Sequence, residues 1–248
     1  MGGDGRPGDA RGYSAAMCNL YHMAPRDHVE RHFRTLVPEG YRELAVGPYN
    51  TGLILRADPQ GTPAMAALMA QWGMVTPGSR ARRPESRAIL TNNARGETIA
   101  SRPTYRDAWR RGQRCLIPCA WYQEPNWETG QNVWWRLTRG DGEPWAIAGL
   151  WSEWTDPATG EIVSNYTMLT VNCDGHPLLG RLHKPDPKLP TDAQDKRSVV
   201  PLEPDQWTAW FEATPDEAMG LLLAPPTERF DLSDAQRTDQ LLGRQTGR

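Results

Sequence analysis

Short strand-like segments follow one another closely through the middle of this 248-residue chain. Turn signals separate them, among them Asp141-Gly142 and the stretch 156–160, and such signals are typical of hairpins. The expected strands span residues 114–117, 120–124, 132–138, 145–151 and 165–171. Seven of the eleven tryptophans lie between Trp121 and Trp154, within the same region. This pattern favours a mostly antiparallel sheet.

Helical patterns lie on both sides of this strand region. Apolar residues at Val29, Phe33 and Leu36 have helical spacing, and Thr214 followed by Pro215 is typical of a capped helix start. The expected helices span residues 26–36, 104–111, 203–211 and 215–222, and two further strands are expected within 44–56 and 65–75. We therefore predict a single α+β domain, with a mostly antiparallel sheet or a partly open β-barrel and short peripheral helices.

The two ends of the chain differ in composition from the rest. Residues 1–17 begin with a segment containing five glycines in sixteen positions and no apolar core of a secretory signal. We interpret 1–17 as a flexible leader or a start site assigned too early. The domain is then expected over 18–232, followed by a polar, frayed tail at 233–248.

Composition excludes several classes of protein. No run of eighteen apolar residues occurs, which argues against a transmembrane helix. Four cysteines do not make a disulfide scaffold, so a reducing cytoplasm is expected. Cys115 and Cys119 lie in an apolar strand-like segment instead of the knuckle of a zinc site. We therefore expect no metal, no cofactor, no membrane partner and a monomer.

Arginine is concentrated in one part of the chain. The sequence holds 25 Arg and 3 Lys, and ten of the arginines lie between Arg80 and Arg114 against three acidic residues. The net charge of the whole chain is −2. Such an asymmetry favours a nucleic-acid or phosphate surface, and the flanking Trp72 and Trp109 suit base stacking. A GC-rich genome and a solvated surface are the alternative explanations.

Cys18 is a candidate nucleophile because it follows Met17, a second candidate start of the protein. Removal of that methionine would leave an N-terminal cysteine, with an amine and a thiol two carbons apart. An α-amino group is substantially neutral near pH 7 and can attack an aldehyde to form an imine. The neighbouring thiol can then close a five-membered thiazolidine ring. The alternative is that Cys18 is a buried small apolar residue.

Four other residues are candidates for proton transfer or phosphate binding. Asn93 and Arg95 lie in a segment that could equally be a turn. Glu124 ends an apolar run and suits a general acid or base, the alternative being an exposed carboxylate at a strand end. His183 lies near basic residues and can carry protons near neutral pH, with His176 as its competitor.

These segments occur in an order that resembles the SRAP family, the SOS response-associated peptidases or abasic-site processing proteins. The resemblance rests on Met17-Cys18, Asn93-Ala94-Arg95, the run from Arg114 to Glu124, and Leu182-His183. It covers about residues 17–212. It implies a DNA-damage response protein that binds single-stranded DNA and crosslinks to abasic sites. It also implies a cysteine-dependent peptidase that cleaves its own leader, with DNA lyase activity as a further expectation.

The resemblance implies a role for each matching residue. Cys18 would be the nucleophile, Asn93 would position the N-terminal residue, Glu124 would act as general acid and base, and His183 would assist imine chemistry. DNA contacts are expected at the following four residues: Arg95, Trp72, Arg114 and Arg181. The protein would then be cytoplasmic and would associate with the nucleoid when DNA is damaged.

This sequence departs from the family pattern beside three of these residues. Cys18 is followed by Asn19-Leu20 in place of Gly-Arg, and Pro125 follows Glu124 where Trp is common. His183 is followed by Lys-Pro-Asp-Pro in place of the usual segment that contains Arg. Two other functions therefore stay open. One is a thiol peptidase acting mainly on its own N-terminus, and the other is a module that binds single-stranded DNA reversibly.

Overall fold

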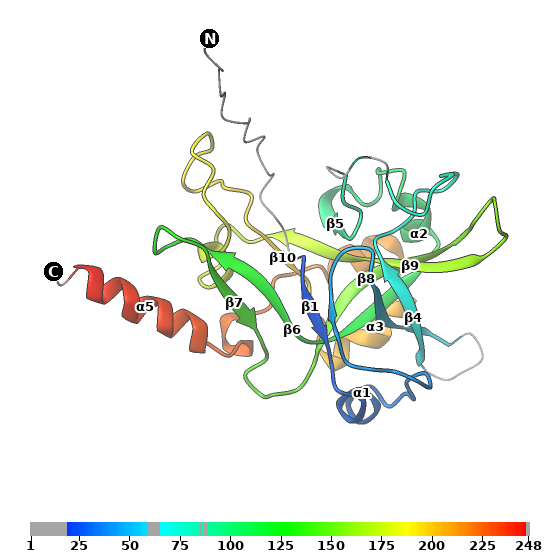
Figure 1. Cartoon of the computed structure of the whole chain (residues 1–248), viewed down its shortest axis with the longest axis horizontal. Coiled ribbons are helices and arrows are strands. Elements are labelled where there is room, and N and C mark those ends of the chain that lie inside the picture. Colours follow the sequence, from blue (N-terminus) through cyan, green and yellow to red (C-terminus); the bar gives the residue numbers. More distant parts are fainter. Residues whose placement is uncertain (1–18, 59–64, 85, 87–88, 247–248) are drawn as a thin grey trace, which may run out of the picture.

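Five strands close into a mixed β-barrel in the computed structural model, which describes residues 19–58, 65–84, 86 and 89–246 (Figure 1). The barrel strands are β3 (Thr51–Ala57), β4 (Met65–Trp72), β6 (Arg114–Asn126), β8 (Trp145–Thr155) and β9 (Ile162–Asn172). β3 pairs with β4 and β6, and β8 pairs with β6 and β9, all antiparallel. Parallel pairing of β4 with β9 completes the ring. The predicted α+β single domain is confirmed, and its barrel is closed.

Further strands extend the barrel walls. They are β1 (Tyr21–Met23), β2 (Ala45–Val46), β5 (Asn93–Arg95), β7 (Val133–Leu137) and β10 (Arg197–Val199). β1 and β7 both pair with the second half of β6, and β2 pairs with β1. β5 and β10 both pair with the end of β9. Segments distant in the sequence thus meet at the ends of β6 and β9.

β6 is one continuous strand of 13 residues, although two separate strands were expected at 114–117 and 120–124, on either side of Pro118. Proline has no N–H to donate to a ladder, so it is confined to positions where no such bond is needed. The partners of β6 change at this point: Cys115 and Leu116 face β3, whereas Cys119 begins the pairing with β1. The register shift opposite His22 and Met23 marks the same change. The strand therefore passes through Pro118 and continues beyond the barrel.

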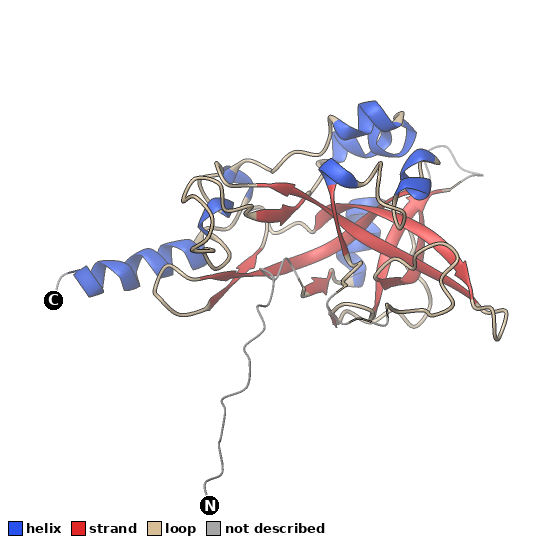
Figure 2. Cartoon of the chain, turned by 90° about the horizontal axis from the view of Figure 1, so that it is seen from above, coloured by secondary structure: helices blue, strands red, loops and turns tan. Residues whose placement is uncertain are grey.

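Short helices lie around the strands (Figure 2). The α-helices are α1 (Arg26–Phe33), α2 (Arg106–Arg110), α3 (Trp207–Glu212), α4 (Pro215–Met219) and α5 (Ser233–Thr246), and the 3-10 turns are η1 (Gly96–Thr98), η2 (Leu179–Arg181), η3 (Pro204–Gln206) and η4 (Thr227–Arg229). α4 has the expected cap: the Thr214 side chain accepts from the N–H of Glu217, and the Glu217 side chain reaches back. In the part of the chain described, no helix is long and apolar enough to cross a bilayer.

The C-terminal segment is helical, and the prediction of a frayed tail is wrong for residues 233–246. α5 projects from the body of the molecule but its first turns are attached to β7 (Figure 1). Asp234 accepts a 2.7 Å hydrogen bond from the backbone N–H of Arg136, and the indole of Trp135 donates to Thr238 at 3.0 Å. These tertiary contacts order a polar segment that has little helix-forming apolar pattern of its own.

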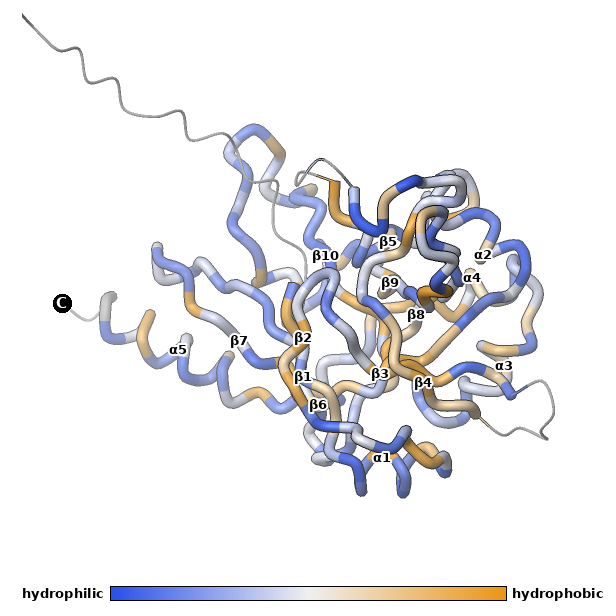
Figure 3. Tube along the Cα trace, turned by 45° about the vertical axis from the view of Figure 1, so that its right-hand side comes forward, coloured by the Kyte–Doolittle hydropathy of each residue, from blue (hydrophilic) through white to orange (hydrophobic). Residues whose placement is uncertain are grey.

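Apolar residues concentrate on the barrel strands, whereas α5 is mostly hydrophilic (Figure 3). The largest side chains that are fully buried include four tryptophans: Trp72, Trp135, Trp145 and Trp210. Truncation of such a residue to alanine typically costs about 3–5 kcal/mol. The aromatic residues that stood out in the sequence are therefore largely used to build the core.

Candidate active site

The second half of β6 carries Glu124 into the interior of the protein. Glu124 is 0% exposed and lies opposite Trp135 of β7. On the other side of the strand, the backbone N–H of Gln123 donates a 3.0 Å hydrogen bond to the carbonyl of Leu20. Glu124 is therefore not an exposed carboxylate at a strand end. A buried carboxylate is costly unless polar or charged groups compensate for its lost hydration.

Asn19 is the first residue that the structure describes, and it lies beside this strand. Its side-chain oxygen accepts a 3.2 Å hydrogen bond from Nδ2 of Asn92. The carbonyl of Asn92 is itself held by the indole N–H of Trp72, at 2.8 Å, and by the N–H of Met168, at 2.9 Å. Cys18, the expected nucleophile, precedes Asn19 in the chain and lies outside the described residues.

Asn93 begins β5 and is buried, with 6% of its surface exposed. β5 pairs in parallel with β9, which places Asn93 opposite Met168. The hydroxyl of Tyr105 donates to the carbonyl of Asn93 at 3.3 Å. The segment that could have been a simple turn is thus a short strand, followed by the 3-10 turn η1.

His183 meets Glu124 from a different part of the chain. Nε2 of His183 lies 3.6 Å from Oε2 of Glu124, and His183 is 4% exposed. The backbone N–H of His183 donates to the carbonyl of Pro125 at 2.6 Å, so the two segments are tied together next to the ring. His183 has φ 62°, in the left-handed region that costs energy for residues other than glycine. The fold holds this backbone geometry through specific contacts.

The hydrogen bond of the His183 ring shows which of its two nitrogens carries a hydrogen. Nε2 lies 2.7 Å from the carbonyl oxygen of Arg197, which can only accept, so Nε2 carries a hydrogen. Nδ1 is then the position that gains or loses a proton. The Glu124 carboxylate lies beside the ring, with Oε2 3.6 Å from Nε2. A buried carboxylate and an imidazole in this arrangement can exchange protons with a reactant and stabilise the charge that results.

Arg95 follows Asn93 on β5 and is half exposed. Its guanidinium lies 2.6 Å from the carboxylate of Asp195, and 50% of its side chain is open to solvent. An exposed ion pair of this kind contributes little stability and is readily exchanged for another anion. Arg95 therefore lies near Asn93 in a position from which a phosphate is accessible.

Trp72 and Arg114 are placed differently from the expectation that they contact DNA. Trp72 is 0% exposed and packs edge-on against Tyr21 in the core. Arg114 is 2% exposed, and its guanidinium lies over the rings of Trp109 and Trp210. Both side chains pack in the interior of the protein. Neither presents a surface to a nucleic acid, because both are buried.

Arg181 lies near the site but its guanidinium already binds two carboxylates. It is 2.8 Å from Glu128 and 2.5 Å from Asp239 of α5. It also lies over the ring of Trp135, at 5.1 Å from the centroid. These contacts join α5 to the loop that carries His183, which indicates a structural role for Arg181.

Sequence reasoning missed two residues that surround His183. Nζ of Lys196 donates to the carbonyl of His183 at 2.6 Å. Arg197 supplies the carbonyl that binds the ring, and its own guanidinium forms two hydrogen bonds of 2.7 and 2.8 Å with Glu97. These bonds lower the pKa of Glu97. The available signal was a pair of adjacent cations directly before the apolar run 198–202.

The described cysteines are buried thiols. Cys115 and Cys119 lie on β6 inside the barrel, and burial raises the pKa of both. Burial also raises the pKa of Cys173 to about 12. Within the described ranges, no group of three or more His, Cys, Asp or Glu side chains is placed to hold a metal ion.

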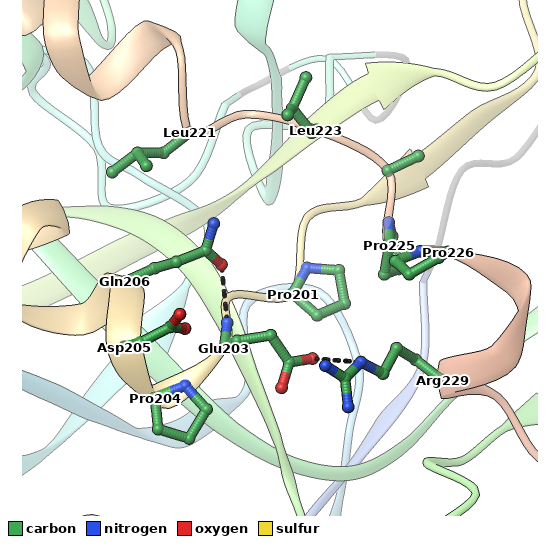
Figure 4. A pocket seen from close by; sticks show the side chains of 11 residues that line it. Pro201, Glu203, Pro204, Asp205, Gln206, Leu221, Leu223, Pro225, Pro226 and Arg229 are labelled. Carbon is green, nitrogen blue, oxygen red and sulfur yellow. Dashed lines mark hydrogen bonds and ion pairs between the residues drawn. The ribbon is translucent and has the colours of Figure 1, made fainter.

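Two surface pockets differ in their relation to these residues. A pocket of about 260 Å³ lies directly beside His183 and is also lined by Trp127, Gln194 and Lys196. Another, of about 540 Å³, lies between η3 and the segment 221–226, where Glu203 forms an ion pair with Arg229 (Figure 4). No predicted site residue lines this second pocket.

Comparison with solved structures gives the same fold. A crystal structure of a protein from Bordetella bronchiseptica matches with a TM-score of 0.74 and 32% identity, covering 86% of this chain and 97% of that one. A protein from Bacteroides thetaiotaomicron matches with a TM-score of 0.65 and 19% identity, covering 86% of this chain and 90% of that one. A phage-related protein from Bordetella bronchiseptica matches with a TM-score of 0.60 and 19% identity, covering 86% and 92%.

No curated protein matches the chain. The family model described as "SOS response associated peptidase (SRAP)" matches residues 17–238, which is most of the sequence and includes Cys18, Asn93, Glu124 and His183. The chain belongs to the SOS response associated peptidase family.

Proposed function

We propose that this protein captures abasic sites in single-stranded DNA through Cys18 exposed as the N-terminal residue. The observation that carries the proposal is the buried pair of Glu124 and His183, 3.6 Å apart. The strand that holds Glu124 is hydrogen-bonded to Leu20, two residues after Cys18 in the sequence. Leu20, two residues after the proposed nucleophile in the sequence, is thus attached to the strand that carries Glu124.

The chemistry begins at the open-chain aldehyde of the abasic sugar. The neutral amine of Cys18 attacks the aldehyde carbon, and the carbinolamine loses water to give an imine. The thiol sulfur then adds to the imine carbon while its proton passes to the nitrogen, which closes the thiazolidine. Glu124 and His183 would supply and remove protons during ring opening and dehydration. The imine stage also permits β-elimination at the sugar, which is the proposed lyase reaction.

Asn93 and Arg95 would position the two reactants. Asn93 is buried on β5, one residue from the Asn92 side chain that binds Asn19. We assign it to the N-terminal residue and to the oxygen that develops during attack. Arg95 is proposed to bind a phosphate beside the lesion, since its guanidinium is half exposed.

The same residues suit removal of the leader. Cleavage of the Met17–Cys18 bond would create the amine on which capture depends, and we propose that Cys18, Glu124 and His183 share this peptidase step. The protein would act as a cytoplasmic monomer without a metal or cofactor.

Trapping with borohydride tests the amine directly. An oligonucleotide containing one abasic site is mixed separately with three proteins. These are protein beginning at Cys18, protein that keeps residues 1–17, and Cys18→Ala with a free N-terminus. Without borohydride, we expect a heat-stable adduct only with the first protein. Cys18→Ala keeps an amine, so it should form an adduct only when borohydride reduces the imine. A heat-stable adduct formed without borohydride by protein whose leader is shown by intact mass to be still attached would disprove the mechanism.

A reversible DNA-binding module is the second candidate function, and the surface arginines favour it. Exposed arginines gather between β4 and β6: Arg80, Arg82, Arg83, Arg95, Arg102, Arg106, Arg110 and Arg111. A basic surface of this kind binds phosphates without covalent chemistry. This function is supported if Cys18→Ala binds and protects DNA as well as the unaltered protein while neither forms an adduct.

A further inference from the structure

We propose that Lys196 is a positioning residue for His183. This inference rests on the proposed function, because it assigns a role within the same site. The three lysines of the chain all lie between Lys184 and Lys196. Lys184 and Lys188 are exposed, whereas Lys196 is buried, with 7% of its surface accessible.

The contact between Lys196 and His183 joins the two ends of a loop. Residues 184–195 leave the site after His183 and return to it at Lys196, where Nζ donates to the His183 carbonyl at 2.6 Å. Inside the loop, the Gln194 side chain binds the carbonyls of Asp186, Leu189 and Pro190. The loop is thus ordered by its own contacts and is closed at its base by a buried ammonium group.

The backbone of His183 needs such support because of its conformation. Its φ of 62° is unfavourable for histidine and persists only where surrounding contacts enforce it. The N–H is bound by the Pro125 carbonyl and the C=O by Lys196, so both peptide groups of the turn are held. The ring is then directed toward Arg197 and Glu124. Loss of the Lys196 bond would free one side of this arrangement.

The cost of burying Lys196 argues that the contact is specific. Removing an ammonium group from water is unfavourable, and burial lowers the pKa of Lys196. Asp174, whose carboxylate accepts from the backbone N–H of Lys196 at 2.8 Å, partly offsets this effect. The charged or ionisable groups facing the His183 turn are Glu124 of β6, Cys173 and Asp174 after β9, and Lys196 and Arg197 at the start of β10.

The decisive variant is Lys196→Met, which keeps most of the length of the side chain and removes its donor. We expect the rate of adduct formation to fall roughly tenfold, as for loss of one charge-assisted hydrogen bond. We also expect a changed pH profile for the rate, which a purely structural contact would not produce. Lys196→Arg, which retains a cationic donor, should recover part of the rate. Lys188→Met, on the exposed part of the same loop, is the matched control and should behave as the unaltered protein.

A measurement on the DNA-free protein separates this inference from the proposed function. The NMR resonances of the His183 ring, assigned by comparison with His183→Asn, should shift in Lys196→Met and stay unchanged in Lys188→Met. Unchanged His183 resonances in a folded Lys196→Met protein would overturn the inference, whether or not an adduct forms. Absence of any adduct from the unaltered protein, together with shifted resonances, would instead support the positioning role and reject the proposed chemistry.

Discussion

The turn around His176 and the turn around His183 lie seven residues apart and use their histidines in different ways. Both rings lie within hydrogen-bonding distance of a backbone carbonyl through Nε2: His176 that of Pro225, at 2.8 Å, and His183 that of Arg197, at 2.7 Å. Nδ1 of His176 accepts from the N–H groups of Leu178 and Leu179. Both ring nitrogens of His176 are therefore occupied by hydrogen bonds with backbone groups.

The His183 ring differs because it lies beside a carboxylate. Glu124 is 3.6 Å away, in a region with almost no exposure to water. Both ring nitrogens of His176 are bound to backbone groups, whereas the His183 ring has a buried carboxylate as a neighbour that suits proton transfer. The comparison shows that the neighbouring carboxylate distinguishes a candidate catalytic histidine from a structural one.

Removal of the carboxylate should have the largest effect. We expect Glu124→Gln to lower the rate of adduct formation by about 10³-fold, within the range contributed by a positioned acid or base. The amide is similar in shape, so the thermal unfolding midpoint should change little by comparison. Single-turnover kinetics with an abasic oligonucleotide measures the rate. A rate within a factor of two or three of the unaltered protein would remove the basis for distinguishing His183 from His176.

Substitution of each histidine by asparagine tests the comparison itself. Asparagine tolerates the left-handed backbone of residue 183, so His183→Asn should fold and should lose roughly 10²-fold in rate. His176→Asn should keep its rate but lose about 1–3 kcal/mol of stability, because the shorter side chain no longer reaches the buried carbonyl of Pro225. Kinetics and urea unfolding of both variants provide the check. If His176→Asn lost the rate and His183→Asn lost only stability, His176 would be the functional residue.

A smaller effect is expected for Arg95, on the side of the site where the phosphate is proposed to bind. Arg95→Gln should weaken binding of single-stranded DNA and reduce the salt slope by about 1, with little change in protein stability. Arg114→Met should show the opposite behaviour: a clear loss of stability and an unchanged salt slope, because its guanidinium binds the carbonyl of Ala213 inside the protein. Fluorescence titrations at several salt concentrations distinguish the two. Equal salt slopes for the unaltered protein, Arg95→Gln and Arg114→Met would argue against a phosphate contact at Arg95.

The smallest effect is expected for Asp174, which connects the turn around His176 with the turn around His183 through Lys196. Burial alone would raise the pKa of its carboxyl, but N–H donors from Lys196 and Asp195 and the amide of Asn172 outweigh burial and lower it. The stabilisation is therefore present above about pH 4, the ordinary pKa, and is lost as the pH falls through the lower value of the folded protein. Asp174→Asn should cost about 0.5–1.5 kcal/mol at pH 6 and less at pH 3. Urea unfolding at both values measures this, and an equal cost at both would contradict it.

Local patterns predicted much of the fold. Turn residues and apolar strands placed β7, β8 and β9 within a few residues of their observed bounds. The break expected at Pro118 and the frayed tail were wrong because both depend on neighbours distant in the sequence. β1 and β3 share β6 on either side of Pro118, and Trp135 and Arg136 hold α5.

The candidate site was less accessible to sequence reasoning. Glu124 and His183 are 59 positions apart, so only the family resemblance suggested that they act together. Trp72 and Arg114 were expected to contact DNA because their residue types suit it, but both are buried, and burial is decided by tertiary packing. Lys196 and Arg197 were missed because buried cations are rare, and two adjacent cations before an apolar run are a weak local signal for burial.

The most direct test is to locate the DNA remnant after capture. Protein beginning at Cys18 is incubated with an abasic oligonucleotide, digested with a nuclease and a protease, and analysed by mass spectrometry. The account predicts that the sugar remnant is attached to the peptide that begins with Cys18, with the loss of one water. A remnant on any other peptide, or no remnant when the N-terminus is confirmed as cysteine, would contradict it.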